Sequence, residues 1–189
     1  MNKNKIRAAV FASGSGSNFQ AIMEKNDLLC DVSLLVCDKP GASVLEKAER
    51  FGVPTFVFDP KKYASKSDYE KEVVRRMQQA DISWIFLAGY MRIVGPTLLN
   101  GYENKIINIH PSLLPDFPGK DAIGQAYKAG VSNTGVTVHY IDEGIDTGPV
   151  IAQESVEVFS DDTEDTLKDR IQQVEHRLYP KIINRLMKE

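Results

Sequence analysis

The sequence predicts an α/β fold in which an open, mostly parallel sheet is flanked by helices. Short apolar runs alternate with segments of helical pattern along the chain, which is typical of this class. A glycine-rich turn, Ser13–Asn18, joins the first apolar run to the first helical segment. The length of 189 residues allows one core centred on a sheet. We therefore expect a single domain over residues 1–189.

The first half of the chain is read as two strand-and-helix pairs followed by a third strand. The strands are apolar runs, the first helix follows the glycine-rich turn, and Gly52 ends the second helix. The predicted strands cover residues 6–12, 32–37 and 54–58, and the predicted helices cover residues 19–25 and 43–51. This order, βαβαβ, predicts parallel strands joined by helical crossovers.

The middle of the chain begins with a helix that a capping box opens. Ser67–Glu70 has the capping-box spacing and predicts a helix that runs to Ala80. A buried strand over residues 84–88 leads into the mostly apolar turn Gly89–Val94, and Pro96 then suits the first turn of another helix. Apolar side chains in such a turn either line a pocket for a flat aromatic ligand or pack beneath neighbouring helices.

A strand that ends at Pro111 carries the first candidate catalytic side chains. Side chains alternate along a strand, so Ile107 and Ile109 face one side of the sheet while Asn108 and His110 face the other. Pro111 ends the strand ladder, which places the polar pair at the carboxyl end of the strand, where open α/β sheets bind ligands. An amide can donate to a developing oxyanion, and an imidazole can exchange a proton near neutral pH. The alternative is that Asn108 caps a turn and His110 is a hydrogen-bonded core histidine.

The last third of the chain is predicted to end in a long helix. The preceding elements are a helix over residues 122–129 and strands over residues 134–140 and 150–158. An acidic loop at residues 141–149 joins these strands, and its Asp146 is read on the sequence alone as a turn carboxylate. We interpret His139 and His176 as structural residues. Thr163 is expected to cap the final helix, and Pro180 is expected to kink or interrupt it.

The glycine-rich turn has the layout of a phosphate site. Glycines let the backbone approach an anion, while Ser17, Asn18 and free N–H groups can donate to its oxygens. Phe19 stands where a dinucleotide-binding turn has its last glycine, and no Gly-Lys-Ser/Thr sequence follows as in an ATP-binding loop. A monophosphate therefore fits better than NAD or ATP. The alternative is a turn with only a structural role.

Composition and charge argue against several classes of partner. The formal net charge is -3 and no Lys/Arg-rich block is present, so we expect neither nucleic acid nor a membrane surface as a main partner. The basic start of the chain runs directly into a strand, without an apolar stretch that suits a signal or membrane helix, so we expect a cytoplasmic protein. Cys30 and Cys37 match no zinc or redox spacing and are expected to be free thiols. The histidines show no metal-ligand spacing, and we expect no metal site.

Three blocks of sequence resemble the folate-dependent formyltransferases. They are Gly16–Asn18, Asn108–Pro115, and Gly135–Tyr140 running to Asp146–Pro149. The resemblance covers essentially the whole chain and is to members that formylate the amine of glycinamide ribonucleotide in purine biosynthesis. It implies 10-formyltetrahydrofolate as the formyl donor and no metal. It also implies a Rossmann-like core and a cis peptide bond before Pro115. With these two substrates as partners, we expect a monomer or a weak homodimer.

The resemblance also implies roles for individual residues. It implies that the catalytic residues are Asn108, His110 and Asp146. It implies that the phosphate and ribose of the nucleotide are bound by Gly16, Ser17, Asn18 and Glu175. It implies that folate is bound by Met91, Arg92, Ile93, Val94, Ile141, Asp142 and Asp146. The chain departs from many relatives at Lys120–Asp121, and Lys66 aligns only loosely with a basic folate contact, so neither is assigned a role.

Several other functions share parts of this pattern. Methionyl-tRNA formyltransferases add a C-terminal RNA-binding domain to such a core and formyltetrahydrofolate deformylases add an N-terminal regulatory domain, and neither addition fits in 189 residues. A deformylase or a sugar-nucleotide formyltransferase core remains the alternative. Phe19 argues against a nucleotide-binding oxidoreductase. The convergence of Asn108, His110 and Asp146 argues against a binding module without catalysis.

Overall fold

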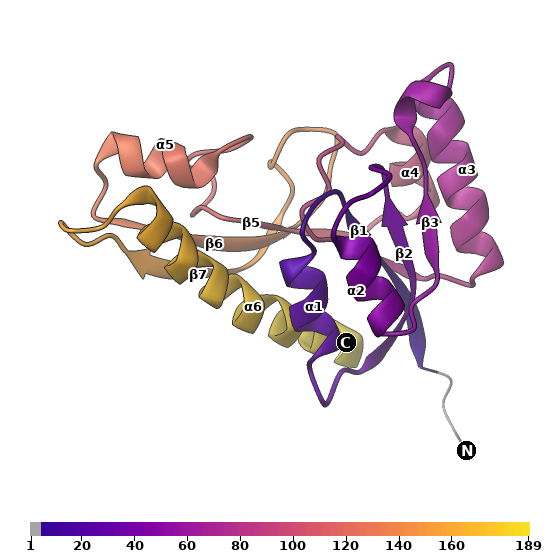
Figure 1. Cartoon of the computed structure of the whole chain (residues 1–189), viewed down its shortest axis with the longest axis horizontal. Helices are drawn as coiled ribbons and strands as arrows, with labels where there is room; N and C mark the ends of the chain where they lie inside the picture. Colours follow the sequence, from indigo (N-terminus) through magenta and orange to yellow (C-terminus); the bar gives the residue numbers. More distant parts are fainter. Residues whose placement is uncertain (1–4) are drawn as a thin grey trace.

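The computed structural model describes residues 5–189, which are organised around a seven-stranded sheet (Figure 1). The strand order is β3-β2-β1-β4-β5-β6-β7. The strands are β1 (Ile6–Ala12), β2 (Cys30–Cys37), β3 (Thr55–Val57), β4 (Trp84–Leu87), β5 (Ile106–His110), β6 (Asn133–Tyr140) and β7 (Val150–Glu157). Neighbouring strands from β3 to β5 are parallel, and β6 and β7 are added antiparallel. This confirms the predicted open, mostly parallel sheet; residues 1–4 of the expected domain lie outside the described residues.

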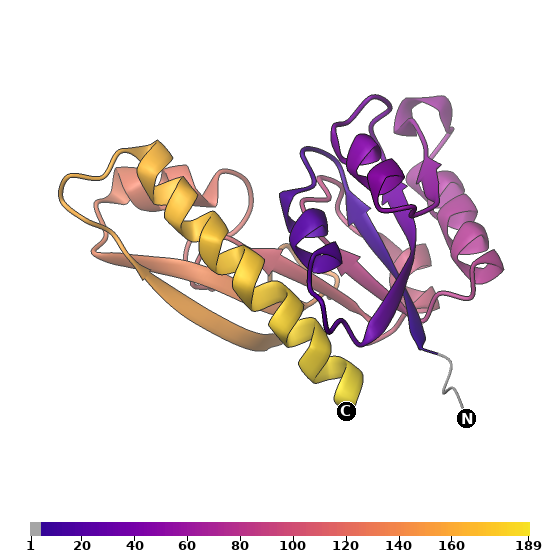
Figure 2. The ribbon, with the colours of Figure 1, turned by 60° about the horizontal axis from the view of Figure 1, so that its bottom comes forward.

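Helices cover both faces of the sheet (Figures 1 and 2). They are α1 (Ser17–Met23), α2 (Val44–Arg50), the short 3-10 helix η1 (Pro60–Lys62), α3 (Lys66–Gln79), α4 (Pro96–Gly101), α5 (Ala122–Ala129) and α6 (Glu164–Lys188). Side chains of β1 alternate between two cores. Ala8, Val10 and Ala12 pack with α1, α2 and α6, whereas Ala9 and Phe11 pack with α3 and α4. Both faces of β1 are therefore apolar, as expected for a central parallel strand.

The C-terminal helix α6 is 25 residues long and runs through Pro180 without interruption (Figure 2). The expectation that Pro180 interrupts the helix is therefore wrong. A proline inside a helix costs about 3 kcal/mol, and buried apolar side chains such as Leu178 and Ile183 on the same helix can outweigh that cost. The Tyr179 hydroxyl also donates to the Leu87 carbonyl at 2.8 Å, which ties α6 to the carboxyl end of β4. Within residues 5–189, no helix combines the length and apolar character that a membrane span requires.

The structure corrects where two of the helices begin. α1 begins at Ser17 rather than at Phe19, with Gly16 as its N-cap. α3 begins at Lys66, and its cap is Ser65, whose hydroxyl accepts the Asp68 N–H at 3.1 Å. The predicted capping box at residues 67–70 is wrong because the Glu70 side chain serves another helix. It accepts N–H groups at the start of α4.

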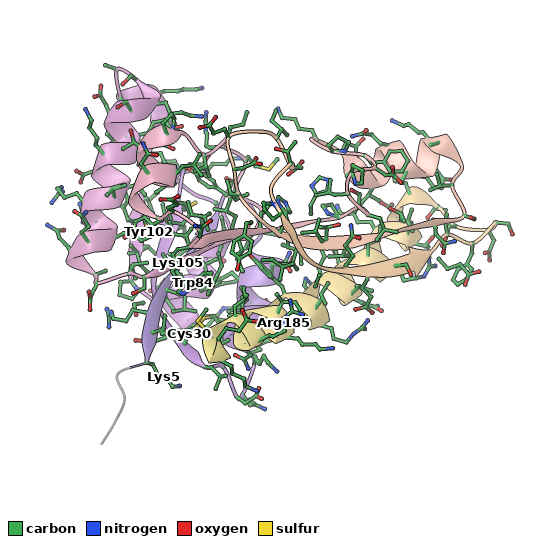
Figure 3. The ribbon with its side chains drawn as sticks, turned by 180° about the vertical axis from the view of Figure 1, so that it is seen from behind. Lys5, Cys30, Trp84, Tyr102, Lys105 and Arg185 are labelled. Carbon is green, nitrogen blue, oxygen red and sulfur yellow. The ribbon has the colours of Figure 1, made fainter. Side chains whose placement is uncertain are left out.

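The amino ends of the parallel strands lie at the edge opposite Asn108 and His110, the predicted catalytic residues of β5. Figure 3 labels Lys5, Cys30, Trp84 and Lys105, which precede or begin β1, β2, β4 and β5. The Lys105 ammonium lies 4.5 Å from the centre of the Trp84 ring. Cys30 at this edge and Cys37 at the carboxyl end of β2 are both buried and free, as predicted, and burial raises the pKa of Cys30 to about 12. This edge therefore holds apolar and cation–π packing.

Candidate active site

The candidate site lies where the carboxyl ends of β1, β4 and β5 meet. Strands β2 and β3 lie on one side of β1 in the sheet, and β4, the next strand in the sequence, lies on the other side of β1. Helices leaving two such strands lie on opposite faces of the sheet, which opens a crevice between their carboxyl ends. A cavity of about 600 Å³ is found here. In Figure 1 the loop that joins β6 to β7 rises between α5 and the α3–α4 pair, and it forms one wall of the cavity.

The cavity brings the predicted catalytic and folate-binding residues together. Its lining includes Asn108, His110, Asp146, Met91, Arg92, Ile93, Val94, Ile141 and Asp142. In the apolar turn, Met91 is 67% exposed and Ile93 is 55% exposed, while Val94 is buried. Met91 and Ile93 therefore line the cavity as an apolar surface, and Val94 also packs beneath α3 and α4. The turn thus both lines a cavity and packs against the core, and the binding of a flat aromatic ligand there stays a prediction.

Strand pairing decides which polar side chains face the cavity. Asn108 and His110 lie on one side of β5, opposite the isoleucines between and before them, as predicted. The antiparallel register of β6 places His139 opposite Asn108, and Thr137 opposite His110. His139 thus belongs to the immediate surroundings of the site, although the sequence led us to interpret it only as a structural residue.

His110 is only 5% exposed and lies between two acceptors. Its Nε2 lies 2.9 Å from the Phe117 carbonyl, and its Nδ1 lies 3.5 Å from Asp146 Oδ2. A carbonyl oxygen can only accept, so Nε2 carries a hydrogen. When the ring is protonated, the Nδ1–H also points to an acceptor, the Asp146 carboxylate. Asp146 itself is oriented by the Gly119 N–H, which donates to Oδ2 at 2.8 Å.

His139 is fully buried and orients the Asn108 amide. Burial lowers the pKa of His139 and outweighs the opposing effects of its hydrogen bond to Tyr140 and of the Asp146 carboxylate. Its Nδ1–H donates to the Tyr140 carbonyl at 2.8 Å. The neutral ring therefore presents Nε2 as an acceptor to Asn108 Nδ2, 3.4 Å away. One amide hydrogen of Asn108 is then directed at His139, and the second is available to a ligand.

The loop that follows His110 is held by β6 and β7. The Thr137 hydroxyl donates to the Ser112 carbonyl at 2.7 Å and accepts the Leu114 N–H at 3.1 Å. The Gln153 amide donates to the Leu114 carbonyl at 2.8 Å. The peptide bond between Leu114 and Pro115 is cis, as the family resemblance implies. Thr137 and Gln153, which the sequence did not single out, thus hold the loop beside the cavity.

The predicted nucleotide contacts lie beside the cavity. Among the described residues that line it, none is Gly16, Ser17, Asn18 or Glu175. The turn is nevertheless adjacent to the cavity, because the Ser13 N–H donates to the carbonyl of the lining residue Gly89 at 3.1 Å. The Asn18 side chain lies beside Glu175 and acts to lower the pKa of its carboxyl group. Asn18 Oδ1 is buried and has no hydrogen-bond partner within residues 5–189, so this pair retains bonding capacity for a polar ligand.

Burial of Glu175 predicts a pH-dependent loss of stability. Burial raises the pKa of Glu175 to about 7, against the smaller effect of the Asn18 side chain beside it. The unfolded carboxyl has a pKa of about 4.3, so between these values the native state binds more protons, and the free energy of unfolding falls as pH rises. We expect urea denaturation to show that Glu175→Gln gains about 2–3 kcal/mol relative to wild type between pH 5 and pH 8. The exposed Glu103→Gln control is expected to follow wild type; an unchanged pH slope in Glu175→Gln would contradict the assignment.

Gly16 is the position in the glycine-rich turn where a side chain cannot fit. Its φ is 75°, and an added Cβ would lie 2.4 Å from Val44 Cγ2 and 2.7 Å from Val44 Cβ. At Gly14 an added Cβ meets nothing within 4 Å. We expect Gly16→Ala to lower the free energy of unfolding by about 2–3 kcal/mol, and Gly14→Ala to change it by less than about 1 kcal/mol. Equal effects of the two substitutions in thermal denaturation would contradict this reading of the turn.

Side chains that could bind a metal ion do not form a cluster within the described residues. Across residues 5–189, no group of three or more His, Cys, Asp or Glu side chains is arranged to hold a metal ion. In the acidic loop, the carboxylate of Asp142 is already hydrogen-bonded to neighbouring residues. The Asp142 carboxylate accepts the Thr147 hydroxyl at 2.6 Å and the Gly144 N–H at 2.9 Å, so it shapes its own loop.

Comparison with known proteins places the chain among formyl-group transferases. Residues 6–183 match a family model described as formyl transferase. The chain is 52% identical over 182 residues to a phosphoribosylglycinamide formyltransferase of Bacillus subtilis (strain 168), covering 95% of this chain and 93% of that protein. A solved glycinamide ribonucleotide transformylase 1 from Geobacillus kaustophilus is 61% identical with a TM-score of 0.95, covering 97% of this chain and 99% of that one. A solved phosphoribosylglycinamide formyltransferase from Bacillus halodurans is 54% identical with a TM-score of 0.94, covering 97% and 96%.

Proposed function

The chain belongs to the formyl transferase family, and from this premise we propose that it transfers the formyl group of 10-formyltetrahydrofolate to the amine of glycinamide ribonucleotide, a step of de novo purine biosynthesis. The observation that carries the proposal is the convergence of Asn108, His110 and Asp146 in one cavity with an apolar wall. Similar proteins from Bacillus subtilis and Geobacillus kaustophilus bear names that state formyl transfer to this nucleotide.

Formyl transfer requires donors for an oxyanion. The substrate amine attacks the formyl carbon, a C–N bond forms, and the carbonyl oxygen takes the negative charge. We assign its stabilisation to the free amide hydrogen of Asn108 and to an N–H of protonated His110. The Nε2–H of His110 now points to the Phe117 carbonyl, which is a weaker acceptor than an oxyanion. As charge develops, this N–H therefore turns from the Phe117 carbonyl to the oxyanion.

Proton transfer is assigned to Asp146. Its carboxylate lies beside His110 Nδ1 and stabilises the imidazolium. Through a water molecule, Asp146 moves a proton from the attacking amine to the folate nitrogen, and the bond between that nitrogen and the formyl carbon breaks. No covalent enzyme intermediate is needed. Orienting both substrates in one crevice contributes up to about 7–11 kcal/mol in favourable cases.

The two substrates are assigned to adjacent parts of the crevice. The apolar side chains of Met91 and Ile93, with the residue 141–146 loop opposite, form a slot for the flat pterin of the folate. The nucleotide is assigned to the glycine-rich turn and to Glu175, with the phosphate at Gly16–Asn18 and the ribose at the carboxyl group. Two observations support this. The buried Asn18 Oδ1, which has no partner within residues 5–189, can accept a ribose hydroxyl, and the turn lies beside Gly89.

We further propose a single domain over residues 1–189 that works in the cytoplasm as a monomer or a weak homodimer. The net charge of -3 and the absence of a Lys/Arg-rich block in the sequence support an enzyme whose partners are its small-molecule substrates rather than nucleic acid or membranes.

Heat protection tests this function against a nucleotide-binding oxidoreductase. A ligand that binds the native state raises the melting temperature. We expect a folate analogue to protect the protein, with further protection when glycinamide ribonucleotide is added, whereas NAD and NADP give none. Protection by NAD or NADP without protection by folate would contradict the proposal.

A further inference from the structure

A buried carboxylate just outside the cavity anchors the apolar turn that forms the folate wall. Asp38 directly follows β2, at the same edge of the sheet as Asn108 and His110. Its side chain is 5% exposed. Oδ2 accepts the Arg92 Nε–H at 3.0 Å, and Oδ1 accepts the Ser13 hydroxyl at 2.5 Å. Hydrogen bonds to a charged acceptor are about twice as strong as neutral ones, so this group is a firm attachment point.

Ser13 extends the attachment from Asp38 to the backbone of the turn. Because its hydroxyl hydrogen is committed to Asp38, the oxygen is free to accept, and it accepts the Met91 N–H at 2.8 Å. The Ser13 N–H donates to the Gly89 carbonyl at 3.1 Å. Asp38 therefore reaches two successive residues of the turn by two routes, the main chain of Met91 and the side chain of Arg92.

The other end of the turn has separate anchors. The Lys66 ammonium donates to the Ile93 carbonyl at 2.5 Å, and the buried Glu70 carboxylate accepts the Gly95 N–H at 2.8 Å. Loss of the Asp38 contacts would thus release the Met91–Arg92 segment while the far end of the turn stays attached. Asn108, His110 and Asp146 are held by other contacts, through β6 and the loop after β5.

We propose that Asp38 is a positioning residue for the formyl donor: through Ser13 and Arg92 it holds the Met91–Arg92 segment in the shape that receives the folate. The proposal rests on the function proposed above. Asp38 is not among the described residues that line the cavity, so it acts through Met91 and Arg92, which do line it. A wall that is shaped before binding avoids the cost of ordering it on binding. Asp38 therefore affects folate affinity rather than the chemical step.

Asp38→Asn tests the proposal because it keeps the side-chain shape and removes the charge. We expect the KM for 10-formylfolate to rise about tenfold, while kcat and the KM for the nucleotide change by less than about threefold. The matched control is Asp31→Asn. Asp31 lies in β2 towards its amino end and pairs with Arg7 at 3.6 Å, far from the cavity edge. The control is expected to leave all three constants unchanged.

The variant Ser13→Ala and a direct measurement of folate affinity separate a loss of the Asp38 contacts from other causes. Ser13→Ala removes the acceptor of the Met91 N–H and is expected to weaken folate binding in the same direction. Folate affinity is also measured directly by fluorescence titration of the folded variants. Wild-type folate affinity in both Asp38→Asn and Ser13→Ala would overturn the role of Asp38, as would equal losses for folate and nucleotide. A wild-type protein that binds no folate would instead overturn the proposed function.

Discussion

His110→Ala is expected to lower kcat for formyl transfer by at least about a thousandfold, because it removes an oxyanion donor together with the group that Asp146 pairs with. The loss appears in kcat more than in either KM, since the imidazole acts on the transition state. His176→Ala is the matched control. His176 is a half-buried histidine of α6 that does not belong to the residues lining the main cavity, and its loss is expected to change kcat by less than about threefold.

Asn108→Ala tests the second proposed oxyanion donor. It removes the amide donor while His139 and the core beneath β5 remain. We expect a loss of about a hundredfold to a thousandfold in kcat, as for removal of one oxyanion donor. Circular dichroism and thermal denaturation establish that each variant is folded. If both His110→Ala and Asn108→Ala turned over at rates near wild type while folded, the catalytic assignment would be wrong.

The second large effect is expected for Asp146→Asn. Asparagine can still accept the Gly119 N–H, so the loop keeps its shape, but the charge beside His110 is lost. We expect kcat to fall by about a hundredfold or more, because the imidazolium loses its counter-charge and proton transfer loses its carboxylate. Both KM values are expected to stay within about threefold of wild type.

The control for Asp146→Asn is an exposed carboxylate on the loop after β5. Asp116→Asn removes a negative charge there, outside the cavity lining, and is expected to leave kcat unchanged. An Asp146→Asn variant with a normal kcat and a raised KM for the folate would show that Asp146 only helps to bind the formyl donor.

Local sequence rules predicted most of the sheet and the positions of two of the proposed catalytic side chains, Asn108 and His110. Alternation along residues 106–110, ended by Pro111, placed Asn108 and His110 together at the carboxyl edge, and the pairing of β4, β5 and β6 confirms that placement. The glycine-rich turn likewise follows a buried strand. These features depend on residues close together in sequence, so a single sequence suffices to predict them.

Features that depend on distant partners could not be predicted in this way. The role of His139 follows from the register of β6 on β5, which local sequence does not contain. The sequence does carry a partial signal, because Val136 and Val138 alternate with Thr137 and His139 and so put His139 on the polar face of β6. The predicted capping box failed because the Glu70 side chain caps α4 instead. Its carboxylate accepts the N–H of Gly95, the N-cap residue of α4, which lies 25 residues later in the sequence.

Following a labelled formyl carbon tests most directly whether the protein transfers the formyl group from folate to the nucleotide amine. Protein is incubated with 10-formylfolate labelled in the formyl group, with or without glycinamide ribonucleotide, and the products are followed by mass spectrometry. We expect the label to appear on the nucleotide amine, folate to be consumed only when the nucleotide is present, and His110→Ala to abolish both. Folate consumed at the same rate without nucleotide, with the label released as formate, would contradict formyl transfer to the nucleotide and identify a deformylase.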